Sequence, residues 1–300
     1  MIELEHYGPV EAFHHGRSPL GFLKPVMSVR CYHIDGLLVD SGLSVFSSAI
    51  GRWAVERGAR RAVITHHHED HSGNSKTLQR RGLEVMASGR TNAWVAQGFS
   101  IRLYQRLVWA PAPATRLSPL PAKVETERYS FEPLPAPGHC DDQMVFFEAE
   151  QGWLFSGDAF LARRIKYFRA DEDFAATLDS LRRLTRLDFA DLFCAHRPVM
   201  GQGKQALLDK LQMLEDLEGK VRELHERGLD PRAITRQVLG PESWMFYLFS
   251  LGDLSKLNLV RSILFGPKLR ADFPPIDATV EQARVVNHAQ AGQSGPEPGR

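Results

Sequence analysis

Residues 64–73 read ITHHHEDHSG and place four histidines within six positions, in a chain of 300 residues that has only 12 histidines. A glutamate and an aspartate stand among them, at Glu69 and Asp70. Neutral imidazole and carboxylate are the usual protein ligands of a borderline metal ion such as zinc. The apolar run RRAVIT (60–65) directly precedes the cluster and predicts a short buried strand. The stretch therefore predicts a metal-binding loop at the end of a strand.

Three further metal-ligand side chains follow strand-like or turn-like segments elsewhere in the chain. His139 follows LPAPG, Asp158 follows WLFSG, and His196 follows DLFCA. Ligands of open α/β sheets bind outside the ends of the strands. A loop such as 64–73 can place His66 and His68 on one ion while Asp70 and His71 turn towards a neighbouring ion. We expect these four segments to meet at one site.

The order of the predicted elements indicates an α/β fold. Residues 26–40 predict two strands joined at the turn pair Asp35-Gly36. Apolar residues at helical spacing then predict a helix within 41–59, before the strand at 60–65. A short helix (75–82), a strand (83–88) and a helix over 92–109 follow in the same alternation. Such alternation is typical of layered α/β architecture.

The texture of the chain changes after Gly203, where long helical patterns replace strands. We expect three segments: a catalytic domain over 1–202, a helical C-terminal extension over 203–268, and a disordered tail over 269–300. The aromatic run Trp244–Phe249 lies in the most apolar stretch of the extension. Packing in the core is favoured for this run over a role in a substrate pocket.

Composition limits the function classes. The net charge is +1, so no global field attracts nucleic acid or anionic membrane, and neither partner is expected. Three cysteines form no disulfide framework, and Cys140 and Cys194 are interpreted as packed thiols. The first residues lack the pattern of a signal peptide, and no apolar run is long enough to span a membrane. The expected location is the cytoplasm.

The ordered pattern His66-x-His68-x-Asp70-His71, His139, Asp158 and His196 resembles the metallo-β-lactamase-fold hydrolase superfamily. GLLVDSGL (with Asp40), PAPGHCDDQ, FSGDAF and CAHRP resemble the other motifs of that superfamily. The resemblance covers roughly residues 20–200. It implies an αβ/βα sandwich with two metal ions at one edge.

The resemblance also implies which residue binds which ion. The first ion takes His66, His68 and His139; the second takes Asp70, His71 and His196; Asp158 bridges them. Asp40 supports the site without binding metal, and His67 lies outside it. Arg197 stands where a glycine is common, which affects access or recognition of substrate charge. The implied cofactors are two divalent ions, with zinc favoured over iron or manganese.

Two adjacent cations polarise a carbonyl and lower the pKa of water to about 7, so no serine or cysteine nucleophile is needed. Asp70 is the candidate catalytic residue, which orients the attacking water or passes its proton onward. We therefore expect a hydrolase of esters, thioesters or lactones, acting on a small molecule with an acyl group. The metal motif is similar to that of three kinds of protein in the superfamily: glyoxalase II-type thioesterases, acyl-homoserine lactonases and the thioesterase-like effector of alkylquinolone signalling.

Three alternatives stay open: a phosphodiesterase or nuclease of the same fold, a mononuclear iron sulfur dioxygenase, and a signalling protein acting through its C-terminal helices. The sequence leaves the substrate, the metal and the oligomeric state open.

Overall fold

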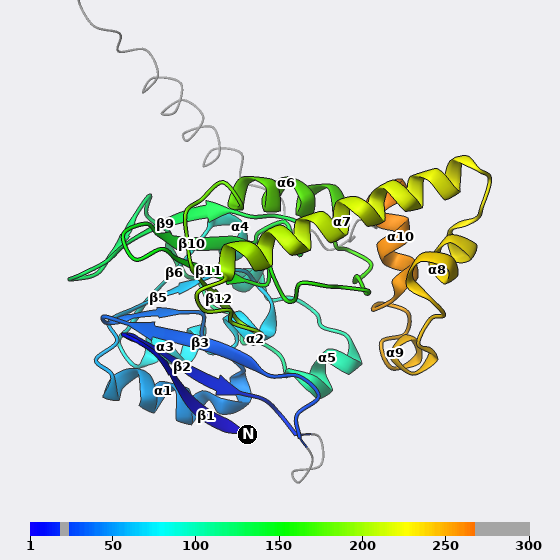
Figure 1. Cartoon of the computed structure of the whole chain (residues 1–300). Coiled ribbons are helices and arrows are strands. Elements are labelled where there is room, and N and C mark those ends of the chain that lie inside the picture. Colours follow the sequence, from blue (N-terminus) through cyan, green and yellow to red (C-terminus); the bar gives the residue numbers. More distant parts are fainter. Residues whose placement is uncertain (19–23, 268–300) are drawn as a thin grey trace, which may run out of the picture.

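The structure, a computed structural model, describes residues 1–18 and 24–267. Two β-sheets pack face to face, and helices cover both outer faces (Figure 1). This arrangement confirms the predicted α/β class and the αβ/βα sandwich with a helical C-terminal region. The predicted tail, 269–300, lies outside the described residues.

The first sheet contains seven strands in sequence order, β1 to β7. The first four strands are antiparallel neighbours, and β4 to β7 pair in parallel. The predicted turn Asp35-Gly36 joins β3 to β4, and both residues have positive φ. The bounds are β1 (Ile2–Tyr7), β2 (Val10–His15), β3 (Val29–Ile34), β4 (Leu37–Val39), β5 (Arg61–Ile64), β6 (Glu84–Ala87) and β7 (Ser118–Pro119).

The second sheet has the order β12-β11-β10-β9-β8. Only β11 and β12 pair in parallel, so their carboxyl ends lie at the same edge of this sheet. The bounds are β8 (Val124–Glu125), β9 (Ser130–Pro135), β10 (Met144–Glu148), β11 (Trp153–Gly157) and β12 (Asp191–Cys194).

The core between the sheets is aromatic. Tyr32 of the first sheet contacts Phe155 and Phe193 of the second, with ring centroids 5.6 and 5.4 Å apart. Phe155 and Phe193 stack on each other at 4.5 Å. All three side chains are almost fully buried, and burial of a side chain of this size contributes about 1.5–3 kcal/mol. This shared core fixes the two sheets relative to each other, and with them the strand ends that carry the site.

Helices cover the outer faces of both sheets. Buried residues of α1 and α3 pack on the first sheet, and those of α6 and α7 pack on the second. Figure 1 shows α7 extending from the sandwich towards α8, α9 and α10. The bounds are η1 (Ser44–Phe46), α1 (Ser47–Glu56), α2 (Glu69–Ser72), α3 (Ser75–Arg80), α4 (Gly89–Gln97), α5 (Leu103–Val108), α6 (Phe174–Leu184), α7 (Gly203–Glu226), α8 (Pro231–Leu239), α9 (Trp244–Phe249) and α10 (Lys256–Phe265).

The C-terminal helices share one hydrophobic cluster with the second sheet. Leu207 and Leu214 of α7 and Leu259 of α10 are buried with Leu178 of α6 and Leu154 of β11. α7 begins at Gly203, where helical texture is predicted to start. None of the described helices is long and apolar enough to cross a membrane.

Two sequence predictions differ from the structure. The single helix expected over 92–109 is two helices, α4 and α5, because the chain turns at Gly98 with a φ of 75°. The aromatic run Trp244–Phe249 is helical but not core: α9 has no buried residue, and Trp244 is 74% exposed. The outer face of the second sheet is already covered by other helices, so apolarity alone does not bury this run.

Candidate metal centre

Four strand ends supply all the residues of the site except His139, which lies in the loop between β9 and β10. β5 runs into Thr65 and the histidine cluster, β4 into Asp40, and β11 into Asp158. His196 lies two residues beyond β12. Gly157 (φ 48°) allows the tight turn before Asp158: a Cβ there would lie 2.6 Å from Gln143 Nε2. Positive φ and crowding together explain a glycine at this position.

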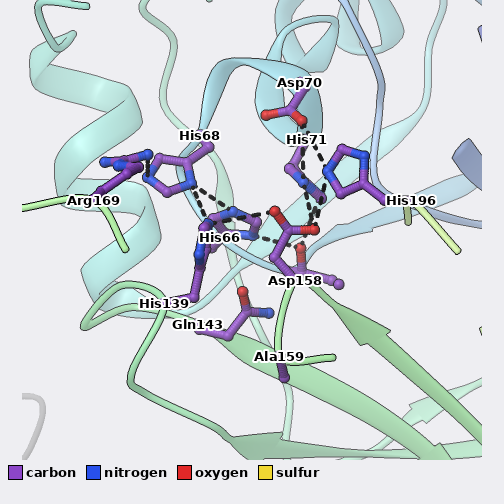
Figure 2. A network of polar contacts seen from close by, with 12 residues as sticks. His66, His68, Asp70, His71, His139, Gln143, Asp158, Ala159, Arg169 and His196 are labelled. Carbon is purple, nitrogen blue, oxygen red and sulfur yellow. Dashed lines mark hydrogen bonds and ion pairs between the residues drawn. The ribbon is translucent and has the colours of Figure 1, made fainter. Parts of the chain in front are cut away.

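Three imidazoles converge at one end of the site. Nδ1 of His68 lies 2.8 Å from Nε2 of His66 and 3.0 Å from Nε2 of His139 (Figure 2). His66 and His68 are buried. Burial holds the pKa of both well below the usual value, aided by His71 beside His66 and by Arg169 beside His68. Neutral imidazole is the form that binds metal, so these nitrogens fit one ion.

A second cluster lies beside the first. His196 Nε2 is 3.4 Å from Asp70 Oδ2 and 3.3 Å from Asp158 Oδ1. His71 Nε2 is 3.6 Å from Asp70 Oδ2 and 3.4 Å from Asp158 Oδ1. Ligand atoms of all four residues lie within 4.8 Å of one another, a spacing that fits a metal ion.

Asp158 lies between the two clusters. Its Oδ1 faces His71 and His196, and its Oδ2 lies 3.4 Å from His139 Nε2 (Figure 2). Oδ1 and His71 Nε2 are both buried without a hydrogen-bond partner. Buried polar atoms normally have hydrogen-bond partners. The lack of one at these two atoms indicates that they bind a ligand that the protein itself does not supply. The donor set and these atoms fit two metal ions sharing Asp158.

Neighbouring groups hold the ligands in place. Asp40 lies 2.7 Å from His71 Nδ1 and accepts from the backbone N–H of Thr65 at 2.8 Å. His196 Nδ1 donates to the carbonyl of Ser28 at 2.7 Å. Such partners fix the ring orientation and raise the basicity of a metal-binding histidine.

Two neighbours of the ligands have other contacts. His67, expected outside the site, contacts Asp142 through its backbone N–H and Nδ1, both at 2.8 Å, and stacks on Trp94. The sulfur of Cys140 lies within 4.8 Å of ligand nitrogens of His66 and His68. The interpretation of Cys140 as a packed thiol did not predict this proximity to the site. All three cysteines of the chain are free.

The structure also adds residues that the sequence did not indicate. Arg169 Nη1 lies 2.9 Å from His68 Nε2, and the same guanidinium donates to both carboxylate oxygens of Asp171. Glu172 lies near His139. Both come from the long connection after β11, where no spacing pattern or strand end marks them. Arg197, which departs from the superfamily motif, is exposed.

Comparison with known proteins supports the fold and the family. The model of the metallo-beta-lactamase superfamily matches residues 31–196, more than half of the chain. A metallo-beta-lactamase family protein from Thermus thermophilus is similar in structure, with 18% identity, a TM-score of 0.63, and coverage of 86% of this chain and 93% of that one.

Two further solved structures are similar over less of the chain. A metallo-beta-lactamase from Erythrobacter litoralis has 20% identity and a TM-score of 0.52, and the match covers 71% of this chain and 100% of that one. FIM-1 from Pseudomonas aeruginosa, solved in a mono-zinc form, has 19% identity and a TM-score of 0.54, covering 72% and 95%. At these identities the likeness shows the fold, and the family model shows the membership: this chain belongs to the metallo-beta-lactamase superfamily.

Proposed function

We propose that this protein is a dinuclear metal-dependent hydrolase that cleaves an ester, thioester or lactone. The observation that carries the proposal is the position of Asp158, whose two oxygens face two different clusters of ligands. His66, His68 and His139 would hold one ion, and Asp70, His71 and His196 the other. When bound, the ions would supply Lewis-acid polarisation of the carbonyl and an activated water at neutral pH.

Asp70 is the residue proposed to handle the proton. Its Oδ2 lies 3.6 Å from His71 Nε2 and 3.4 Å from His196 Nε2, and its other oxygen is Oδ1. Oδ1 can accept a proton from the attacking water and pass it to the leaving group. Proton transfer by a positioned side chain typically contributes about 10²–10⁴-fold to the rate.

The substrate proposed is a small molecule with an acyl group, and the apolar surface beside the site supports it. Phe249 of α9 contacts Tyr104 of α5, with ring centroids 5.8 Å apart. The next residue of α5, Gln105, donates to Glu69 in the histidine loop at 3.1 Å. These contacts connect α9 through α5 to the histidine loop. The acyl chain of a substrate bound at the site can lie against the exposed apolar surface of α9.

A substrate panel tests the function. Protein of measured metal content is assayed with an aryl ester, an acyl thioester, a lactone and bis-nitrophenyl phosphate, beside the variant Asp158→Ala. We expect turnover of at least one acyl substrate and its collapse in the variant. Turnover of the phosphodiester alone would instead support the nuclease alternative. Oxygen consumption with a persulfide, by protein containing one iron, would support the dioxygenase alternative.

A further inference from the structure

His139 differs from the other candidate ligands in what its second ring nitrogen contacts. Its Nε2 faces His68 and Asp158, whereas its Nδ1 is buried without a hydrogen-bond partner. The equivalent Nδ1 atoms of His71 and His196 contact Asp40 and the carbonyl of Ser28, both at 2.7 Å. A neutral imidazole that gives Nε2 to a metal carries its proton on Nδ1. His139 therefore needs an acceptor when metal binds.

Glu172 is the residue placed to accept a hydrogen bond from this N–H. Its Oε2 lies 3.7 Å from His139 Nδ1, and the residue is only 7% exposed. The distance is too long for a hydrogen bond, but a movement of well under 1 Å would close it. Both residues line the same pocket beside Asp158, and Glu172 is the carboxylate of that lining that faces Nδ1.

Three other polar side chains of this pocket are already engaged. Lys210 is a cation without acceptor capacity, and its Nζ donates to the carbonyls of Ala159 and Phe160 at 2.9 and 2.6 Å. The hydroxyls of Thr177 and Ser180 donate to backbone carbonyls at 2.7 Å each. A carboxylate is a stronger acceptor for a ring N–H than these groups are, and Glu172 is the carboxylate that faces Nδ1.

Glu172 is itself held by the C-terminal helices. Its carbonyl accepts from Ser262 Oγ of α10 at 2.8 Å, and the same hydroxyl accepts from the backbone N–H of Phe174 at 3.0 Å. Its Oε1 accepts from the backbone N–H of Arg169 at 3.1 Å. Packing of α10 on α6 thus sets the position of Glu172, which couples the C-terminal extension to the first ligand cluster.

We propose that Glu172 is a positioning residue for the first metal ion: its carboxylate accepts a hydrogen bond from the Nδ1–H of His139 and holds that ring in its binding orientation. The inference rests on the metal centre of the proposed function. It does not depend on which substrate is cleaved, because the property concerned is metal affinity.

Three variants test this role. Glu172→Leu removes the acceptor at similar size, and Glu172→Gln keeps an acceptor oxygen without charge. Glu148→Gln is the matched control, because Glu148 is also buried but its Oε2 accepts from the backbone N–H of Gln151, which is not a residue of the site. Stepwise zinc dissociation constants are measured by competition with a chromophoric chelator. Loss of such a supporting partner costs about 10- to 100-fold in metal affinity.

We expect Glu172→Leu to lower the affinity for one of the two zinc ions by that factor, and Glu172→Gln to lower it less. Glu148→Gln should bind zinc with the wild-type affinity. A purely structural role would lower the thermal midpoint of the metal-free protein and leave the zinc constants unchanged, and that result would overturn the proposal. The NMR signal of the His139 Nδ1 proton in zinc-loaded protein gives a second readout. If Glu172→Leu does not fold, an unchanged signal in Glu172→Gln overturns the proposal.

The wild-type protein separates this inference from the proposed function. Zinc binding with no acyl turnover would contradict the function and leave the Glu172 measurement decisive. A wild type that binds no zinc would contradict both.

Discussion

Oδ2 of Asp40 lies 2.7 Å from Nδ1 of His71, and both side chains are buried. Nε2 of the same ring faces Asp70 and Asp158, so one imidazole links a supporting carboxylate to the second ligand cluster. Carboxylate–histidine pairs of this kind fix the tautomer that leaves Nε2 free for metal.

Asp40→Ala should therefore lower the affinity for the second metal ion by about 10- to 100-fold, although it removes no ligand. It should also destabilise the fold, because the buried N–H of Thr65 loses its acceptor, at a cost of about 1–3 kcal/mol. Zinc titration and urea unfolding measure the two effects. Asp179→Ala, at an exposed side chain, is the control. Wild-type zinc affinity in folded Asp40→Ala would show that this contact does not support the metal.

Asp158→Ala removes the one carboxylate that faces both clusters. Binding of the second ion should fall sharply and hydrolysis should collapse. The fold should remain, because the contacts of this carboxylate are with His71, His139 and His196 of the site and not with the scaffold. Circular dichroism, metal content and turnover are measured on one sample. Turnover equal to that of the wild type would exclude Asp158 from the site.

His15 predicts a stability change with pH. It is fully buried, its Nδ1 lies 3.0 Å from the carbonyl of Phe13, and its Nε2 accepts from the backbone N–H of Leu43 at 3.0 Å. Burial is the main cause that lowers the pKa of His15 to about 4 from 6.5. Below pH 6.5 the unfolded chain binds a proton that the folded chain does not, so this residue costs stability as the pH falls towards 4.

The measurement compares urea unfolding of metal-free wild type and His15→Gln. The variant should be the less stable at pH 7, because it loses packing around the ring. The difference in free energy of unfolding between the two proteins should be smaller by about 2 kcal/mol at pH 5, since only the wild type carries the histidine. A gap that is equal at both pH values would show that His15 titrates normally in the folded protein.

The apolar surface of α9 should determine acyl-chain preference. Each methylene buried against it contributes about 0.8 kcal/mol, so affinity should rise with acyl length in the wild type. Trp244→Ala and Phe246→Ala should flatten this dependence with metal content unchanged. Phe265→Ala on α10, where the side chain is 65% exposed, is the control. An unchanged length profile in the two α9 variants would exclude α9 from acyl recognition.

Local patterns in the sequence predict a layered α/β fold and place the candidate ligands after strands, whereas the αβ/βα sandwich comes from the resemblance to a known superfamily. His66 to His71 directly follow a short apolar strand, and Asp158 and His196 follow two strands that prove to be parallel neighbours. The supporting residues Arg169 and Glu172 have no such marker, since only the path of the chain after β11 brings them near the histidines.

The prediction for Trp244–Phe249 was wrong for a related reason. An apolar run indicates that burial would be favourable, but whether a core is available depends on the other helices. Here α6, α7, α8 and α10 already share the hydrophobic cluster on the outer face of the second sheet. α9 is joined to its surroundings by ring contacts such as Phe246 with Tyr167, and its side chains stay exposed.

The metal content of protein purified without chelator tests the central claim most directly. Two ligand clusters that share Asp158 predict about two equivalents of metal per chain, with zinc the expected ion. Elemental analysis before and after supplementation with zinc gives the number. About two equivalents, falling in Asp158→Ala, is the result that this account predicts. A single equivalent that stays at one after supplementation would contradict it.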